Sequence, residues 1–439
     1  MQTQPSPTHI AVVNGTIWSM TGEDPFNGSL LLEKGKIRRV LKHGAPAQPY
    51  DDVLAAVTPL CGEIAAFLRE AGQNDGQTSG ENAGQRSENR SCVLDATDRW
   101  VLPGFIDAHC HVGIGEEIYR YEGDDVNEMT DPLTPQVRVL DGVNPEDLAF
   151  QDAFQAGITA VFTIPGSGNV IGGTGAVLKT TGRVVDEMVV REPAGLKVAF
   201  GENPKMVYGE QKKMPMTRMG TAALLRQTLA DAKSYMEKKE QGVKDPDKLP
   251  DFDLGLENIA LVLNRTIPLR AHAHRSDDIM TAIRIAQEFD IDLVLDHCTD
   301  GHKIADVLAA YPYSAAVGPT LISRAKVELK DKSFSTPGIL ASHGVKVAIV
   351  TDHSVIPIEY LPLCAALAVR SGMTEEDALK AITIWPAEML GVASTIGSLA
   401  PGKDADIVLW TNRPLSWDAD AETVIINGSL VKRSNKEAG

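Results

Sequence analysis

Between residues 101 and 350 the chain repeats one pattern, in which short apolar runs rich in β-branched residues alternate with longer segments of helical periodicity. The eight runs are residues 101–106, 158–164, 176–180, 196–200, 268–273, 292–295, 314–317 and 345–350. Alternating strands and helices predict an α/β fold with a parallel sheet, and eight strands predict a TIM-like (β/α)8 barrel. Intervening helices are expected at residues 144–156, 222–239, 276–289, 302–310 and 336–343, and another at 375–390.

Both ends of the chain carry a different pattern. Residues 9–41 and 396–432 read as short strands broken by turn signals such as Lys34-Gly35 and Asn427-Gly428. We therefore expect a small β-sandwich domain built from both termini, residues 1–100 and 393–439, beside a barrel domain of residues 101–392. The first part contains an insertion near residues 54–95, in which the polar stretch 73–91 is expected to be mobile.

Charge and cysteine content exclude several classes of protein. The formal net charge of −17 at pH 7 opposes binding to nucleic acid or to anionic membranes, both of which need clustered basic residues. The five cysteines are scattered and lack paired spacing, so we expect no disulfide framework. The sequence shows no signal peptide and no apolar run of membrane-spanning length. We expect a cytoplasmic protein that acts on a small molecule, and the sequence leaves self-association as a homo-oligomer open.

Polar residues that can bind metals gather where the predicted strands end. In a parallel barrel these carboxyl ends form one face, and residues two apart on a strand point the same way. Imidazole and carboxylate ligands suit zinc, iron, manganese or nickel better than calcium or magnesium. The sequence therefore predicts a transition-metal centre at this face. The polar residues at the strand ends are Asp107, His109, His111, Glu202, Lys205, His272, His274, Arg275, Asp296, His297, Asp352 and His353.

Five segments together resemble the amidohydrolase superfamily, with the closest likeness to its imidazolonepropionase-related branch. The first is Pro103-Gly-Phe-Ile-Asp-Ala-His-Cys-His111, and the second is a histidine after the fifth strand. The others are Leu295-Asp-His-Cys-Thr-Asp-Gly-His302, Thr351-Asp-His-Ser354 and Gly397-Ser-Leu-Ala-Pro-Gly-Lys-Asp-Ala-Asp-Ile-Val408. The resemblance covers the barrel and both flanking β segments.

The resemblance implies a binuclear centre, which we expect to hold two zinc ions per chain, with iron, manganese or nickel as alternatives. His109, His111 and Asp352 would hold the first metal, and Asp352 would also be the catalytic base. His272 and His297 would hold the second metal.

The bridge between the two metals has two candidates. Family members use either a carbamylated lysine on the fourth strand or a glutamate, and we prefer Glu202. Lys197 lies five residues earlier, too deep for the barrel mouth if the strand is regular.

The substrate-binding candidates are less constrained. His272 and His274 lie two residues apart and face the same way, so either one could be the metal ligand. The other candidates for substrate contact are Arg275, Lys205, Tyr208 and His302, although His302 has a second interpretation as a helix cap. We expect Asp107 to accept an imidazole N–H, and we expect Asp296 to point to the opposite face of its strand.

These residues imply a metal-dependent hydrolase that cleaves a carbon–nitrogen bond of an amide, cyclic amide or amidine. Metal-activated water would attack, with Asp352 as general base. A metallo-dipeptidase is an alternative, and so is a deaminase, which ranks lower because the fifth strand has no nearby glutamate. A catalytically silent scaffold is the alternative outside enzymes, and the nearly complete ligand set argues against it.

Overall fold

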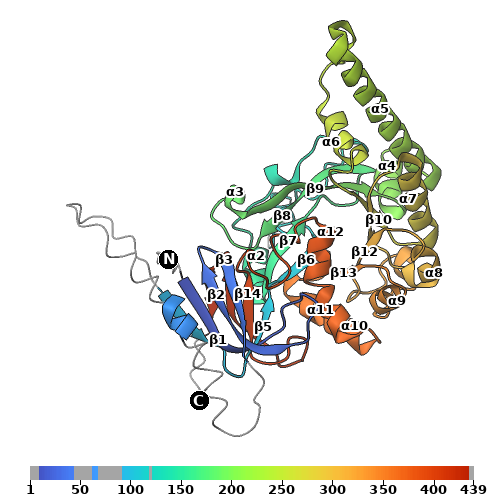
Figure 1. Cartoon of the computed structure of the whole chain (residues 1–439). Helices are drawn as coiled ribbons and strands as arrows, with labels where there is room; N and C mark the ends of the chain where they lie inside the picture. Colours follow the sequence, from blue (N-terminus) through green and yellow to red (C-terminus); the bar gives the residue numbers. More distant parts are fainter. Residues whose placement is uncertain (1–8, 44–61, 68–90, 118–120, 435–439) are drawn as a thin grey trace. The chain divides into compact units, whose positions relative to one another are not determined.

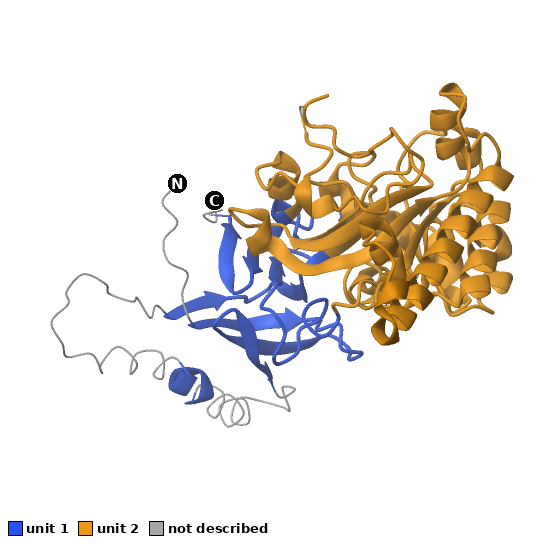
Figure 2. Ribbon diagram, turned by 90° about the horizontal axis from the view of Figure 1, so that it is seen from above, with its two compact units in different colours: residues 1–105, 154–159, 393–439 blue, residues 106–153, 160–392 orange. Residues whose placement is uncertain are grey.

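The computed structural model describes residues 9–43, 62–67, 91–117 and 121–434 (Figure 1). The chain divides into two compact units, one of residues 1–105, 154–159 and 393–439 and the other of residues 106–153 and 160–392 (Figure 2). The stretch predicted to be mobile, residues 73–91, lies outside the described residues except for Ser91, where a strand begins.

The first unit contains an eight-stranded sheet formed by both termini. Its strands are β1 (His9–Ile17), β2 (Phe26–Glu33), β3 (Lys36–Lys42), β4 (Ser91–Asp95), β5 (Trp100–Pro103), β14 (Ile407–Trp410), β15 (Ala421–Ile426) and β16 (Ser429–Arg433). The order is β16-β15-β14-β5-β1-β2-β3, and β4 pairs with β1. The predicted turns are where the chain reverses, because Gly35 and Gly428 have the positive φ values, 78° and 72°, that hairpin turns need.

The second unit is built on the other eight-stranded sheet, whose strands follow chain order from β6 to β13. They are β6 (Phe105–Cys110), β7 (Ile158–Thr163), β8 (Ile171–Lys179), β9 (Val189–Ala199), β10 (Leu269–Ala273), β11 (Leu293–His297), β12 (Ser314–Val317) and β13 (Val347–Ile349). Backbone hydrogen bonds continue between the two end strands, from Asp352 N to His109 O at 3.2 Å and from His111 N to His353 O at 2.7 Å. The sheet is therefore a nearly closed TIM-like barrel, as predicted.

One predicted strand runs in the opposite direction. β8 is antiparallel to both β7 and β9, so the expectation of a wholly parallel sheet is wrong for the run at residues 176–180. The connections are too short for crossovers, because parallel neighbours need about a dozen or more connecting residues. Only residues 164–170 separate β7 from β8, and the short helix α3 (Val185–Met188) lies in the connection to β9.

Helices surround the barrel strands in chain order (Figure 1). The α-helices are α2 (Leu148–Gln155), α4 (Glu202–Glu210), α5 (Arg218–Lys244), α6 (Leu254–Leu263), α7 (Ser276–Phe289), α8 (Ala305–Leu308), α9 (Thr336–Ser342), α10 (Leu361–Arg370), α11 (Glu375–Lys380) and α12 (Ile384–Met389). Short 3-10 helices include η4 (Gly301–Ile304) and η5 (Val327–Leu329). The predicted helix at 276–289 matches α7, whereas the one at 375–390 is split into α11 and α12.

The barrel core explains why these segments pack where they do. Leu225 and Leu229 of α5, Ile259 of α6 and Ile283 of α7 belong to one buried apolar cluster with Leu269 of β10. Apolar side chains recurring at helical spacing thus cover the outer face of the strands.

Among the described residues, no helix is both long and apolar enough to cross a membrane. The described cysteines Cys92, Cys110, Cys298 and Cys364 are free.

Candidate metal centre

Two groups of side chains could hold a metal ion, and most of their members come from the ends of the barrel strands. His109, His111 and Asp352 form the first group, and His272, His274 and Glu328 form the second; within each group the ligand atoms lie within 4.8 Å of one another. The ring of His297 lies 4.9 Å from that of His109, 4.4 Å from that of His272 and 4.9 Å from that of His274, between centroids. The predicted ligands from the first, fifth, sixth and eighth strands therefore come together.

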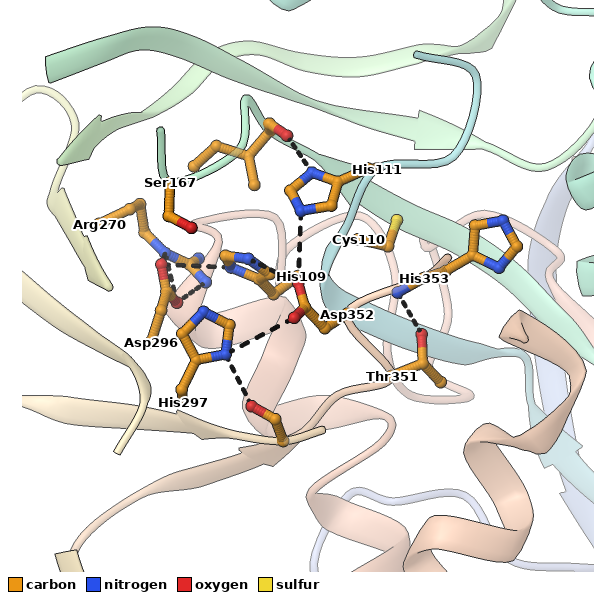
Figure 3. Close-up of polar contacts among 12 residues, drawn as sticks. His109, Cys110, His111, Ser167, Arg270, Asp296, His297, Thr351, Asp352 and His353 are labelled. Carbon is orange, nitrogen blue, oxygen red and sulfur yellow. Dashed lines mark hydrogen bonds and ion pairs between the residues drawn. The ribbon is translucent and has the colours of Figure 1, made fainter. Parts of the chain in front are cut away.

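The side chains of His109, His111 and Asp352 point toward one another (Figure 3). His111 Nδ1 lies 2.7 Å from the carbonyl oxygen of Ile164, so this nitrogen carries the proton and Nε2 carries a lone pair. That Nε2 lies 3.3 Å from Asp352 Oδ1, and His109 Nε2 lies 3.4 Å from the same oxygen. Acceptors that face one another repel unless a cation lies between them, so this arrangement fits a metal ion.

A buried ion pair orients the imidazole of His109. His109 Nδ1 lies 3.2 Å from Asp296 Oδ2, and Arg270 Nη2 lies 2.6 Å from Asp296 Oδ1, with all three side chains fully buried. The Arg270 guanidinium also lies over the ring of Phe162, 4.6 Å from its centroid. Burial alone would raise the pKa of Asp296, but the positive charge of Arg270 and the adjacent His109 ring hold it well below its usual value. Asp296 therefore remains ionised and favours the His109 tautomer whose Nε2 can bind a metal.

The predicted roles of Asp107 and Asp296 are therefore wrong. Asp296, which we expected to point away from the site, contacts the imidazole, and Asp107 contacts backbone instead. Asp107 accepts the backbone N–H of His109 at 3.0 Å, and it accepts the N–H and the hydroxyl of Thr351 at 3.0 and 2.6 Å. Burial raises the pKa of Asp107 to about 6 despite these hydrogen bonds. Asp107 thus connects the end of β6 to the segment that follows β13.

Two of the predicted ligands have left-handed backbone conformations. The φ angle is 69° at His297 and 56° at Asp352, where side chains other than glycine are disfavoured by about 1–2 kcal/mol. Strained backbone of this kind concentrates at functional sites, where surrounding contacts hold it. Here His297 is the last residue of β11, and Asp352 lies three residues after the end of β13.

Lys197 reaches the centre of the site. Its Nζ lies 3.2 Å from His109 Nε2, and only 1% of the residue is exposed. The premise that Lys197 is too deep is therefore wrong, because its flexible four-carbon stem carries the amine toward the end of β9. Burial lowers the pKa of Lys197 to about 8, although Asp296 and Asp352 favour its charged form.

Glu202 lies elsewhere, as the first residue of α4. Neither ligand group of the described residues includes it. Its charge acts instead on Glu328: burial is the main cause that raises the pKa of Glu328, and Asp278 and Glu202 add to that effect.

The second ligand group consists of deeply buried, neutral imidazoles and a carboxylate. Burial and the neighbouring His297 keep the pKa of both His272 and His274 well below the usual value. His274 Nδ1 lies 2.8 Å from Thr299 Oγ1, which leaves Nε2 available. Among the described residues, neither ring nitrogen of His272 has a hydrogen-bond partner. Buried unpaired nitrogens are costly, so they support a ligand at this position.

Two of the predicted substrate contacts are engaged with protein groups. Arg275 forms an ion pair with Asp277 at 2.9 Å, and both side chains are exposed. The Tyr208 hydroxyl donates to the carbonyl oxygen of Asp131 at 2.8 Å, and the residue is fully buried.

The other two substrate candidates lie on short helices that follow β9 and β11. His302 belongs to η4, and its Nδ1 lies 3.1 Å from the carbonyl oxygen of Thr299 and 3.0 Å from Thr336 Oγ1. None of the helices η4, α8 and α9 has a side-chain cap hydrogen bond, so His302 links the segment after β11 to Thr336 of α9 and caps none of these helices. Lys205 is half-buried on α4.

The sequence reasoning missed Glu328 and the Arg270–Asp296 pair. Charged residues inside the apolar strands β10 and β11 were a signal for the pair, because buried charges need partners. Glu328 had no such signal, since it comes from a loop segment between β12 and β13.

The chain is similar to known proteins along most of its length. An amidohydrolase from Thermotoga maritima MSB8 with a crystal structure is 41% identical and has a TM-score of 0.83, covering 97% of this chain and 100% of that one. The imidazolonepropionase of Pseudomonas fluorescens is 24% identical over 81% of this chain and 90% of its own. Amidohydrolase tasK of Hapsidospora irregularis is 27% identical over 77% of this chain, but the match spans only 37% of that longer protein. The profile described as Amidohydrolase family matches residues 225–431.

The chain belongs to the amidohydrolase family, as its motifs indicate. It is therefore an enzyme that acts on carbon–nitrogen bonds. Enzymes of this family depend on metal, and the two groups of ligands at the barrel mouth are candidates to bind it.

Proposed function

We propose that this enzyme hydrolyses a carbon–nitrogen bond of a small amide, cyclic amide or amidine, using two divalent transition-metal ions and Asp352 as general base. The observation that carries the proposal is the convergence of His109 Nε2 and His111 Nε2 on Asp352 Oδ1, at 3.4 and 3.3 Å.

A divalent cation bound at this place supplies a Lewis acid that polarises the scissile carbonyl and lowers the pKa of water toward about 7. His109, His111 and Asp352 would hold one ion, and His272 and His297 would contribute to the other. His297 Nδ1 lies 2.7 Å from the carbonyl oxygen of Gly318, which leaves its Nε2 free to bind.

Asp352 has the properties of a base. Burial would raise its pKa, but the surrounding histidines His297, His109 and His111 hold it well below the usual value, so it is ionised at neutral pH. Its Oδ2 makes only one long contact among the described residues, 4.0 Å from His297 Nδ1. That oxygen can take a proton from water and return it to the leaving nitrogen.

Lys197 replaces Glu202 as the favoured bridge between the two ions. Its pKa of about 8 leaves part of the amine neutral at physiological pH. A neutral amine adds to carbon dioxide and loses a proton, which gives a carbamate with two oxygen ligands. The position of Nζ, 3.2 Å from His109 Nε2, supports this role.

The surroundings favour a small cyclic amide over a dipeptide. The arginines that could bind the carboxylate of a dipeptide are engaged with protein groups: Arg275 with Asp277, Arg218 with Asp278 and Glu328, and Arg324 with the carbonyl oxygen of Lys330. A hollow of about 1040 Å³ includes Ile114 and Gly172, and a Cβ built on Gly172 would lie 3.6 Å from Lys197 Cγ. This hollow gives a small substrate a route toward the lysine.

The experiment is a hydrolysis screen of lactams, cyclic ureas, N-acyl amino acids and dipeptides with the enzyme loaded with zinc, iron, manganese or nickel. We expect turnover of a cyclic amide, its loss in Asp352→Asn, and its retention in the matched control Asp277→Asn. Failure of every metal-loaded form on every substrate class would reject the proposal. Turnover that survives in Asp352→Asn would reject the assigned base.

A further inference from the structure

We propose that Glu328 is a ligand of the second cation and that, with His272, His274 and His297, it makes that site three imidazoles and a carboxylate. This inference rests on the proposed function for the presence of a second ion. It adds a residue from the loop between β12 and β13, whereas the strand-end motifs supply only histidines for this position.

The Glu328 carboxylate is buried, and only one of its two oxygens has a hydrogen-bond partner among the described residues. Only 3% of the residue is exposed. Its Oε1 accepts from Arg218 Nη2 at 3.0 Å, while Oε2 has no hydrogen-bond partner among the described residues. An unpaired carboxylate oxygen that is shielded from water is costly unless a cation or a donor meets it. A ligand atom of this carboxylate lies within 4.8 Å of those of His272 and His274.

The surrounding residues hold Glu328 in this position. Arg218 also binds Asp278 through Nε, at 2.9 and 3.1 Å from the two carboxylate oxygens, so the guanidinium is fixed from both sides. Gly201 has a φ of 80°, and a Cβ on it would lie 2.6 Å from Glu328 Oε1. The chain after β9 therefore needs a glycine where it passes the carboxylate. Lys326 donates to Asn203 Oδ1 at 2.9 Å and ties the same loop to α4.

The facing imidazoles are prepared to bind a cation with Glu328. His274 is fixed through Nδ1 by Thr299, so its Nε2 is available, and both nitrogens of His272 are unpaired. Ligands of one zinc-like ion lie about 2.0–2.2 Å from it, hence roughly 3.3–4.4 Å apart. Separations of up to 4.8 Å therefore need only small side-chain movements. Imidazole with one carboxylate suits Zn²⁺, Fe²⁺, Co²⁺ or Mn²⁺.

The test is to titrate metal-free full-length protein with Zn²⁺ by calorimetry, to count bound metal by mass spectrometry, and to record visible absorption with Co²⁺. The variant is Glu328→Gln, and the matched control is Glu210→Gln, which changes the exposed glutamate that ends α4. We expect two ions in the parent and the control. In Glu328→Gln, the weaker ion should lose about tenfold or more in affinity, and the Co²⁺ spectrum of that site should change.

Unchanged stoichiometry, affinities and Co²⁺ spectrum in Glu328→Gln would overturn the inference, and so would a parent protein that binds a single ion. If Glu328→Gln does not fold, Glu328→Asp keeps the charge beside Arg218 but withdraws the oxygen, and the same loss is expected. These measurements report metal binding and are independent of any hydrolytic activity. A Glu328-dependent second ion in a protein that hydrolyses no screened compound would support this inference while rejecting the proposed reaction.

Discussion

Replacing Asp296 with asparagine tests two roles of the buried network around His109: its contribution to the free energy of unfolding and its contribution to metal affinity. Arg270 and Asp296 are each 0% exposed, and their shortest contact is 2.6 Å. Removing one partner from such a pair leaves a buried charge and costs about 3–5 kcal/mol. The asparagine keeps the volume and one acceptor oxygen, so we expect a loss of about 3 kcal/mol, a large part of a typical free energy of unfolding of about 5–15 kcal/mol.

The same substitution should weaken the first cation. Asp296 lies 3.2 Å from His109 Nδ1, and loss of such a supporting carboxylate typically lowers metal affinity about 10–100-fold. Urea unfolding of the metal-free protein measures the stability, and zinc titration measures the affinity. The matched control is Glu288→Gln, which removes the partner of Arg226 in an exposed pair at 2.7 Å and should cost at most about 1 kcal/mol.

A double variant, Arg270→Met with Asp296→Leu, tests whether the loss of stability comes from the unpaired buried charge. Replacing a whole buried ion pair with apolar side chains is often neutral, so stability should return toward that of the parent. Metal affinity should stay low, because His109 still lacks its carboxylate. If Asp296→Asn alone matches Glu288→Gln in stability and binds zinc like the parent, the buried pair has neither of the roles given to it.

Three further predictions concern the same core. Lys197→Met should lower the bound metal from two ions toward one, and native mass spectrometry of the parent should show the carbamate; two ions in Lys197→Met would exclude the lysine bridge. Gly195→Ala should cost about 1–3 kcal/mol by overpacking, because its Cβ would lie 2.7 Å from Arg270 Cγ, whereas Gly209→Ala, with nothing within 4 Å, should not destabilise in the same urea assay. Thr351→Val removes the hydroxyl 2.6 Å from Asp107 Oδ2 and should cost about 1–3 kcal/mol, measured by thermal unfolding; a loss below about 0.5 kcal/mol would contradict the role of Asp107.

Strand positions could be predicted because buried barrel strands are apolar along most of their length, although β10 also carries Arg270 and His272. All six residues of β7 and all five of β10 are buried, which leaves a clear run in the sequence. Strand direction could not be predicted in the same way, since it depends on connection length. The predicted run began at residue 176, whereas β8 begins at Ile171, and the missed glycine-rich start concealed how short the preceding connection is.

The candidate site also contains residues that could be predicted from the sequence and residues that could not. Ligands at the ends of parallel strands could be predicted, because neighbouring strands deliver them to one edge. Lys197 and Glu328 could not be placed from strand ends alone. The lysine depends on the reach of its flexible stem, and Glu328 depends on a loop that Arg218 fixes from a helix 110 residues away in sequence.

The contrast between the two ligand groups gives a physical reason for a second cation. In the first group His109 has a polar protein group on each side, with Asp296 Oδ2 3.2 Å from Nδ1 and Lys197 Nζ 3.2 Å from Nε2. In the second group, His272 has no hydrogen-bond partner among the described residues, and Glu328 keeps one oxygen unpaired. Fold stability alone would favour apolar residues at both positions, since unpaired buried polar atoms cost about 1–3 kcal/mol each. The sequence retains them, and a bound cation would satisfy the lone pairs of nitrogen and oxygen together.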